Sequence, residues 1–540
     1  MTWMNQLIVA PILLPLLTAA IMLWLGEKHR PLKAQINLWS SILGLGISIS
    51  LFMWVQTTGT TGSIGVYLPG NWEVPFGIVL VVDHLSAMML VLTGIVGVCA
   101  LLFALARWDR AGASFHALFQ IQLMGLYGAF LTADLFNLFV FFEMMLAASY
   151  GLLLHGSGPM RVKAGLHYIA INLAASSLFL VGVSLIYGAT GTLNMADLAM
   201  RITTIGPESR MLMEAGAAIL GIAFLVKAGM WPLGFWLPAT YSAATPPVAA
   251  IFAILTKVGV YILLRLSMLL FGADAGASLG FGQSVLLYGG LLTIGFGAIG
   301  VLASQAMGRL AGYCVLVSSG TLMAAIGLGN GAVIGGALFY LVSSTLTICA
   351  FFLLIELVER ARDAGADVLA VTMEAYGDVD ENEAEKEGGV AVPGTMAVLG
   401  LCFCACAILL SGLPPLSGFL AKFAMLHGLF NPGSFGDDAP VSGAEWAYTA
   451  LLILSGLAAM IAMNRVGIRT FWTSIEGTIP RVFLIEITPV LILLAACVFL
   501  SFQAGPVMRY MDATAKSLGE PQNYIGRVMS APLAGPAAGE

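Results

Sequence analysis

Four ionisable side chains in this sequence lie inside long apolar segments, where a charge is costly to bury. Glu143 lies in the run ADLFNLFVFFEMMLAAS, and Lys227, Lys257 and Lys422 lie deep in other apolar stretches. A charged side chain at the centre of a bilayer costs roughly 2.5–3.5 kcal/mol even on lenient insertion scales. Because leucine would carry no such cost, we expect these groups to be used. Carboxyls and amines whose proton affinity is altered by burial are groups that pass protons.

Glu143 needs a neighbour that shares its charge. Burial alone favours the neutral carboxyl, whereas a nearby ammonium group favours the ionised form. Lys227 is the best candidate for that ammonium, because it begins the segment KAGMWPLGFWLP at 227–238. Prolines and glycines there break a helix, and the freed backbone groups need water or polar neighbours. The competing interpretation is a structural ion pair that only holds two helices together.

A group of hydroxyl side chains lies on an apolar segment between Lys257 and Lys422 in the sequence. Its members are Ser343, Ser344, Thr345 and Thr347. They could hydrogen-bond waters into a proton relay, or they could satisfy carbonyl groups of their own helix. The sequence leaves these two interpretations open.

Three further charges near segment ends have ordinary explanations. We expect Arg265 to be an interfacial anchor whose head reaches toward the lipid headgroups. Asp83 and Asp134 begin their segments, where a carboxylate complements the helix dipole, so we expect both to cap helices.

The composition places these residues in a membrane. The 540-residue chain is 59% hydrophobic and only 10% charged, with a mean hydropathy of +0.94. Apolar stretches long enough to cross a hydrocarbon core recur throughout, and only helices or closed barrels can do so. The first of them, at about 7–25, lacks a basic leader and a cleavage site and is expected to be a retained helix. We also expect small buried thiols rather than a metal site at Cys402, Cys404 and Cys406.

The predicted fold class is an all-α polytopic membrane protein of about fourteen helices. The spans are 6–25, 36–56, 78–106, 114–132, 134–154, 165–188, 213–241, 246–270, 284–303, 310–327, 333–357, 393–430, 447–465 and 487–505. The seventh and twelfth are too long for plain helices and carry the predicted breaks, at Pro232, Pro238, Pro414 and Pro415. Broken helices at matching places in two halves are typical of transporters with inverted repeats.

This pattern suggests four parts and an orientation. The parts are N-terminal helices (1–113), a first five-helix repeat (114–270), a second repeat (284–465) with an acidic loop (358–391), and a last helix with a polar tail (466–540). Most loop lysines and arginines fall on alternate loops, which places those loops in the cytoplasm and both termini outside. The acidic run DVDENEAEKE at 378–387 is expected to be solvated, and the tail after Gly505 to be a loosely ordered extension.

Several stretches together resemble the D-type subunit of the multisubunit Mrp (Pha) cation/proton antiporters. They include ADLFNLFVFFEMMLAASYGLLLHG, LVKAGMWPLGFWLPATYSAATPPVAAIFAILTKVGVY and GLPPLSGFLAKF, and the similarity runs over about residues 5–505. This family is related to the antiporter-like proton-pumping subunits of respiratory complex I. The resemblance implies two inverted five-helix repeats and assembly with subunits of the A, B, C, E, F and G types in a bacterial inner membrane. It also implies export of Na⁺ or K⁺ in exchange for H⁺.

The resemblance assigns proton translocation to the same four residues whose charges are costly to bury in a membrane. The family's membrane glutamate falls on Glu143, and its lysines fall on Lys227, Lys257 and Lys422. Many relatives carry histidines and a lysine on the eleventh crossing, where this chain has the four hydroxyl-bearing residues and Ile348. A proton transfer there would have to use hydroxyls and water.

Two other classes of function compete with antiport. One is the proton-pumping membrane subunit of a redox complex, such as a complex I-like NADH:quinone oxidoreductase or a membrane-bound hydrogenase. The other is a structural scaffold, which the cost of the four buried charges disfavours. We find no nucleotide-binding, haem or iron–sulfur motif, so we expect a transporter subunit rather than an enzyme, with no cofactor and no nucleic-acid partner.

Overall fold

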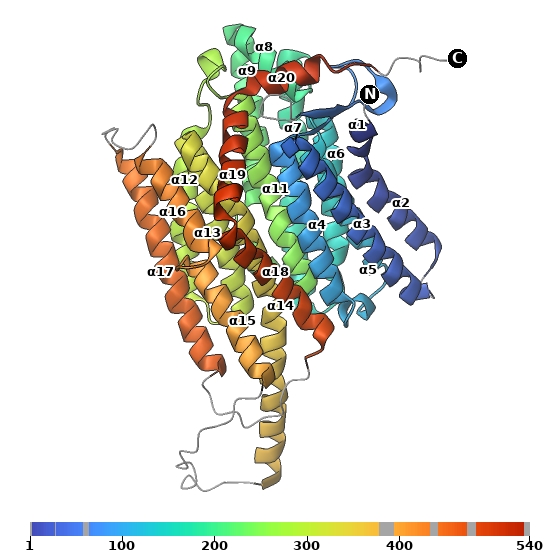
Figure 1. Ribbon diagram of the computed structural model, residues 1–540, viewed down its shortest axis with the longest axis vertical. Coiled ribbons are helices and arrows are strands. Elements are labelled where there is room, and N and C mark those ends of the chain that lie inside the picture. The colour runs from blue at the N-terminus through green and yellow to red at the C-terminus, as the bar shows by residue number, and fades with distance from the viewer. Residues whose placement is uncertain are drawn as a thin grey trace.

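Long helices form nearly the whole computed structural model shown in Figure 1. The structure describes residues 3–26, 29–57, 64–376, 394–431, 441–471 and 482–533. Within these ranges, 12 helices are long and apolar enough to cross a membrane, and the shorter helices Ala10–Trp24 and Phe115–Leu131 are apolar too. These helices fall on the predicted spans, and the predicted polytopic all-α class is confirmed. The exact number of crossings and the repeat boundaries stay predictions.

The N-terminal half builds one side of the bundle. Its helices are α1 (Trp3–Leu7), α2 (Ala10–Trp24), α3 (Arg30–Thr57), α4 (His84–Ala104), α5 (Phe115–Leu131), α6 (Leu135–Leu154), α7 (Pro159–Thr190), α8 (Met195–Thr204), α9 (Pro207–Ala228), α10 (Trp236–Ala243) and α11 (Pro246–Leu270). Three 3₁₀ turns complete the connections up to α12, at Pro69–Asn71, Trp108–Arg110 and Gly276–Ser278. Asp83 and Asp134 cap α4 and α6 as predicted, since each carboxylate accepts a backbone N–H three residues later.

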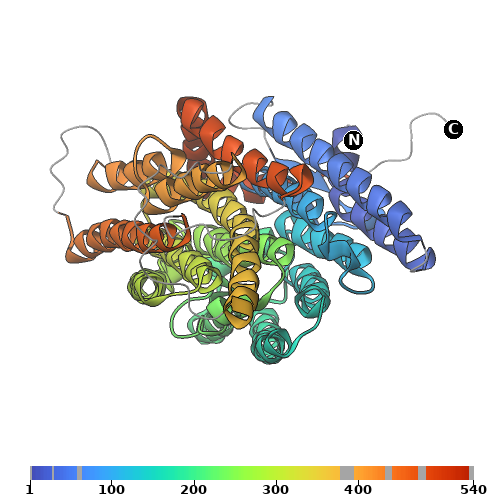
Figure 2. The same ribbon diagram turned by 90° about the horizontal axis from the view of Figure 1, so that it is seen from below.

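The C-terminal half continues the bundle. Its helices are α12 (Gln283–Ala303), α13 (Met307–Leu328), α14 (Gly331–Tyr376), α15 (Gly394–Ser411), α16 (Ser417–Phe430), α17 (Gly443–Phe471), α18 (Leu484–Phe502), α19 (Ala504–Gly519) and α20 (Pro521–Met529). Seen from below, α14 lies near the centre, between the N-terminal helices and helices α15 to α17 (Figure 2). The helices α1 and α20 lie at the same end of the molecule (Figure 1).

Two of the predicted spans are broken. The first break separates α9 from α10 and is capped by Gly229, whose φ of 79° is a left-handed conformation that glycine adopts without strain. The second separates α15 from α16 after Gly412, whose φ is 76°. Pro232, Pro414 and Pro415 lie in these breaks. Pro238 instead lies in the first turn of α10, where a missing N–H costs little.

Three expectations need correction. The span predicted to start at 78 begins with strand β2 (Leu80–Val82), which pairs antiparallel with β1 (Gly65–Tyr67). Helix α14 continues to Tyr376, so it replaces the first part of the predicted loop; the acidic run at 378–387 lies outside the described residues. The tail is not loosely ordered up to residue 529, because α19 and α20 bury one face each.

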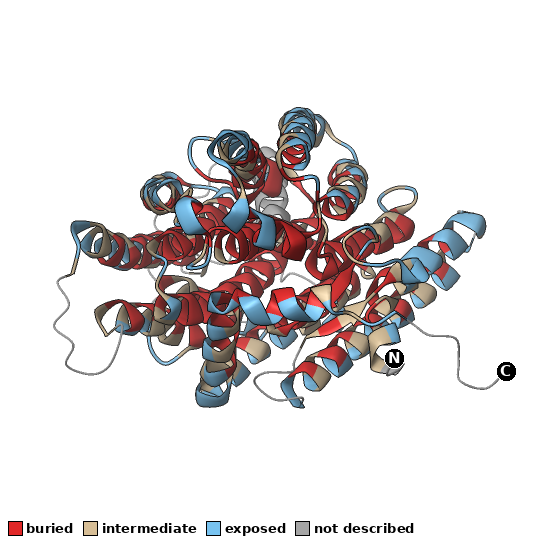
Figure 3. Cartoon of the chain, turned by 90° about the horizontal axis from the view of Figure 1, so that it is seen from above, coloured by how far each residue is buried: buried red, intermediate tan, exposed pale blue. Residues whose placement is uncertain are grey.

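Burial is greatest in the helices that link the two halves. Every residue in the most apolar window of α11 is buried, and almost every one in α13 and α14. Figure 3 shows the buried residues gathered in the middle and the exposed ones on the outward faces of the surrounding helices. Large apolar side chains are exposed on those faces, including Leu17, Trp39 and Leu173, as expected where lipid is the solvent.

Candidate functional site

Helix α7 connects the first two candidate residues. Glu143 on α6 accepts a short hydrogen bond from the hydroxyl of Ser176, while Lys227 Nζ on α9 lies 3.4 Å from Asn172 Oδ1. Asn172 and Ser176 are one helical turn apart and both are buried. The two charges do not form a direct ion pair, because Lys227 has no carboxylate oxygen within 4.0 Å in the described part of the chain. The competing interpretation of a structural ion pair therefore does not apply to these two residues. A polar bridge on α7 stands between the two charges.

Lys227 itself is almost completely enclosed. Its side chain is 1% exposed, and its ammonium lies 5.4 Å from the ring centre of Phe142 and 5.6 Å from that of Tyr168. Aromatic faces attract a cation and are the best apolar substitute for water. Because Lys227 is the last residue but one of α9, it lies beside the first helix break.

In the second half of the chain, the hydroxyl-bearing residues between Ser343 and Thr347 have two different roles. Lys257 Nζ on α11 donates to Ser318 Oγ over 2.7 Å, and Ser318 shares a 2.9 Å hydrogen bond with Ser344 on α14. Ser343 shares a 2.8 Å hydrogen bond with Ser417, the first residue of α16. Ser343 and Ser344 thus reach across helices, as the relay interpretation requires.

The threonines behave as the other interpretation predicts. Thr345 donates to the carbonyl of Leu341 over 2.6 Å, and Thr347 donates to that of Ser343 over 2.8 Å. Both hydroxyls bond carbonyls of their own helix, and that of Thr347 also lies 3.6 Å from Cys497 Sγ on α18. The stretch from 343 to 347 therefore contains two candidate relay residues and two residues that satisfy their own helix.

A small cavity lies between the two serine pairs. Its volume is about 20 Å³, and its lining includes Ser318, Ser343, Ser344 and Thr347. A water needs roughly 10–15 Å³ of such volume and two to four polar partners. One water fits here, in reach of the Ser318–Ser344 pair that contacts Lys257 and of Ser343, which bonds Ser417 on α16.

Lys422 lies at the second helix break. Its ammonium donates over 3.0 Å to the carbonyl of Ser411, the last residue of α15, and its side chain lies against Gly412. The last carbonyls of a helix have no partner within it. Lys422 therefore supplies a donor that the break requires.

Sequence reasoning missed four contributors: Asn172, Ser176, Ser318 and Ser417. Each is a small polar residue in an apolar helix, and each contacts a candidate residue from a different helix. Asn172 and Ser176 gave one usable signal, because their four-residue spacing places two polar groups on one face of α7.

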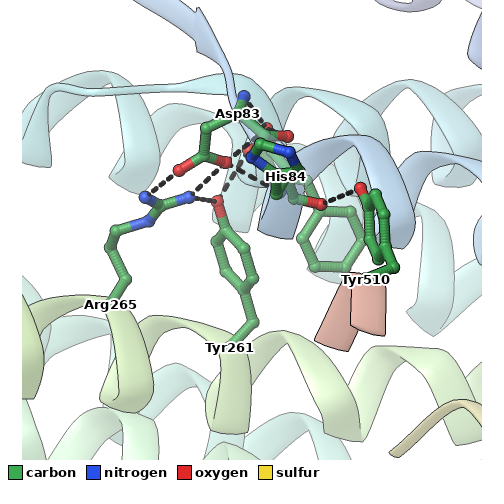
Figure 4. A network of polar contacts seen from close by, with 7 residues as sticks. Asp83, His84, Tyr261, Arg265 and Tyr510 are labelled. Carbon is green, nitrogen blue, oxygen red and sulfur yellow. Dashed lines mark hydrogen bonds and ion pairs between the residues drawn. The ribbon is translucent and has the colours of Figure 1, made fainter. Parts of the chain in front are cut away.

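Arg265 is not the interfacial anchor that was expected. It is 6% exposed and pairs with Asp83 through both terminal nitrogens of its guanidinium group (Figure 4). The sequence could not show this, because the two residues are 182 positions apart.

No group of three or more potential metal ligands occurs among the residues that the structure describes. Of the three clustered cysteines, Cys402 and Cys406 are buried, but Cys404 is exposed, so the expectation of buried thiols is wrong for Cys404. The alternating spacing explains the difference, since neighbouring positions of a helix face different directions.

Comparison with known proteins identifies the family. The profile of the NADH:quinone oxidoreductase/Mrp antiporter transmembrane family matches residues 132–435. A protein of Rhizobium meliloti, named as the probable D-type subunit of a K⁺/H⁺ antiporter, is 67% identical over 99% of both chains. The chain belongs to this family. The resemblance stated from the motifs is confirmed.

Other family members show how far the similarity extends. The D-type subunit of the Na⁺/H⁺ antiporter of Alkalihalophilus pseudofirmus is 34% identical over 97% of this chain and 100% of its own. The fold also matches a chain in a solved Mrp complex from Dietzia, with a TM-score of 0.81, 24% identity and coverage of 98% and 100%. A chain of respiratory complex I from Thermus thermophilus matches with a TM-score of 0.73, 21% identity and coverage of 95% and 99%. These two likenesses concern the fold alone.

Proposed function

We propose that this chain is the proton-translocating, D-type subunit of a multisubunit antiporter that exports Na⁺ or K⁺ in exchange for H⁺. The observation that carries the proposal is that, among the residues that the structure describes, no carboxylate directly neutralises Lys227, Lys257 or Lys422. Lys227 contacts an amide, Lys257 a hydroxyl and Lys422 a carbonyl. These neutral oxygens accept a hydrogen bond from an ammonium without fixing its charge, so the lysines are free to exchange protons.

In the proposed path, the proton passes from one ionisable residue to the next. Glu143 and Lys227 exchange charge through the polar bridge of α7, and Lys257 passes a proton through Ser318 and Ser344. A water in the cavity connects these to Ser343 and Ser417, next to the break where Lys422 lies. Each protonation changes the field at the following group, and this change is coupled to cation export.

The proposal includes the surroundings of the chain. Subunits of the A, B, C, E, F and G types would surround it in a bacterial inner membrane, with both termini outside. Because α1 and α20 lie at one end of the molecule, the structure supports their being on the same side of the membrane; the outward side rests on the distribution of loop lysines and arginines. The chain would act as a transporter subunit and not as an enzyme, and it would need no cofactor.

A redox-driven proton pump remains the second candidate because members of that class share the fold. Neighbouring genes separate the two: small antiporter subunits favour antiport, and iron–sulfur proteins favour the redox complex. The 67% identity to an antiporter subunit favours the first.

Potassium is expected to be exchanged at least as well as sodium. The relative at 67% identity is named for K⁺, and the one at 34% is named for Na⁺. The test is a dye assay of the pH gradient in everted vesicles that carry the whole operon, with KCl or NaCl added. A dissipated gradient with K⁺ supports the proposal. No response to either cation, in vesicles that contain the assembled complex, contradicts it.

A further inference from the structure

A buried ion pair lies at the end of α11 nearest α20. Arg265 Nη2 donates to Asp83 Oδ1 over 2.9 Å, and Nη1 contacts Asp83 Oδ2. Nη2 also lies 3.1 Å from the hydroxyl of Tyr261, which donates to the carbonyl of Phe130 over 2.8 Å. Figure 4 shows the carboxylate facing the guanidinium group, with Tyr261 beside it. The pair joins α4 to α11.

The C-terminal helices cover this pair. The ring of Tyr524 on α20 lies 5.3 Å from the guanidinium carbon of Arg265, and the ring of Tyr261 lies 5.4 Å from it. Tyr510 on α19 donates to the carbonyl of His84 over 2.7 Å. The side chains of Asp83 and Arg265 are about 6–7% exposed, so water screens their charges little.

Asp83 keeps its charge at every working pH. Burial alone raises the pKa of Asp83, but the charge of Arg265 and hydrogen bonds from Arg265 and Ser86 together hold it at about 2. An arginine in a protein also stays charged. The pair is therefore a fixed charge pair, and neither member carries the transported proton.

Helix α11 links this pair to the proton path. Lys257 is eight residues from Arg265 on α11, a separation of about 12 Å along the axis. At an effective dielectric constant of about 20, a lone unit charge at that distance changes proton affinity about tenfold, which is about one pH unit. Paired with Asp83, the charge of Arg265 is largely cancelled.

Other titratable groups surround the two sites. Those around Arg265 are His84 on α4, Tyr261 on α11, Tyr510 on α19 and Tyr524 on α20. Near Lys257 lies Cys349 on α14, and near Cys349 lies Cys99 on α4. Helix α9, which carries Lys227, packs against α11. Thiols and phenols are neutral near pH 7. Asp83 is the one carboxylate among these neighbours of Arg265 and Lys257, so its negative charge is the one that cancels the charge of Arg265.

We propose that Asp83 and Arg265 are positioning residues that set the charge environment of Lys257 from the end of α11. This inference rests on the proposed role of Lys257 in proton transfer. Asp83 neutralises a cation that would otherwise repel the protonated lysine, and the C-terminal helices keep water from the pair. Within the tail after residue 505, Tyr510 and Tyr524 thus support the charge environment of the proton-transfer residues.

The test measures exchange against pH for Asp83→Asn, Arg265→Gln and the double variant, per assembled complex. Asp83→Asn leaves a buried positive charge and is expected to shift the pH of half-maximal exchange down by about one unit. Arg265→Gln leaves a carboxylate that either stays charged or takes up a proton, so its shift is upward or absent. The double variant restores the parent profile. Downward shifts in both single variants, or none in Asp83→Asn, would overturn the proposal.

A lone buried charge can prevent a single variant from assembling with its partner subunits. In that case the double variant tests the proposal. It leaves no charge, so it is expected to assemble better than either single variant and to keep the parent pH profile. A double variant that assembles no better, or whose profile is displaced, contradicts the proposal. Lys257→Ala is measured in parallel. Full exchange in Lys257→Ala overturns the proposed role of Lys257 in proton transfer. If Lys257→Ala loses exchange but the pH profile of Asp83→Asn is unshifted, only the inference about Asp83 and Arg265 is overturned.

Discussion

Alanine at Glu143 or at Lys227 is expected to abolish cation-dependent proton exchange in everted vesicles. A positioned proton-transfer group typically contributes about 10²–10⁴-fold to a rate, so the residual exchange falls at least about 100-fold. The complex is expected to assemble, because neither change breaks a direct ion pair. Glu143 bonds Ser176 and Lys227 bonds Asn172, so each substitution leaves only a neutral partner, which costs far less than an unpaired buried charge.

Matched control variants come from the same chain. Glu214 is half-buried like Glu143 and accepts a 2.7 Å hydrogen bond from a serine, Ser278. It lies 13 residues before Lys227 on α9, about 20 Å along the helix axis. Lys516 is an exposed lysine on α19. Alanine at Glu214 or Lys516 should leave exchange near the parent rate. Parent-like exchange in Glu143→Ala or Lys227→Ala, with normal amounts of partner subunits co-purified, would refute the assignment.

Removing the hydroxyl of Ser344 is expected to slow exchange about tenfold, and so is removing that of Ser318. Both lie between Lys257 and the cavity, joined by hydrogen bonds of 2.7 and 2.9 Å. The effect is smaller than for a titratable residue because a water can enter the space that alanine leaves and restore part of the connection. The measurement is the initial rate of the cation-induced change in dye fluorescence.

Thr345→Val is the control for this prediction. Thr345 neighbours Ser344, but its hydroxyl bonds the carbonyl of Leu341 in its own helix. Valine keeps the shape and removes the hydroxyl, so exchange should stay at the parent rate. If Ser344→Ala and Thr345→Val slow exchange equally, the effect comes from disturbed packing of α14 and not from a proton relay.

The fold and the principal charged residues could be predicted because both follow from the free energy of placing a short stretch of sequence in lipid. An apolar stretch of about twenty residues must form a helix in lipid, and Lys227 or Lys422 is conspicuous because burying a lysine is expensive. The helix breaks at Gly229 and Gly412 follow from the same local chemistry, since nearby prolines cannot continue a helix.

The partners could not be predicted because they depend on packing between distant segments. Ser318 contacts Lys257 across 61 positions, and Asp83 meets Arg265 across 182. Serine in an apolar helix most often bonds its own backbone, so its type does not reveal which neighbour it faces. The tail was misjudged for a similar reason. Its polar composition concealed a buried face whose residues, such as Tyr510 and Tyr524, pack only against other helices.

The central claim is that Glu143, Lys227, Lys257 and Lys422 pass protons inside the membrane and are not there to hold helices together. The most direct test is the pH-gradient assay in everted vesicles that carry the whole complex with Lys422→Ala. Lys422 bonds only a backbone carbonyl among the described contacts of its ammonium, so the loss of that bond should not prevent assembly. We predict that K⁺ and Na⁺ no longer dissipate the gradient although all subunits co-purify. A gradient dissipated at the parent rate by the assembled variant would contradict the account.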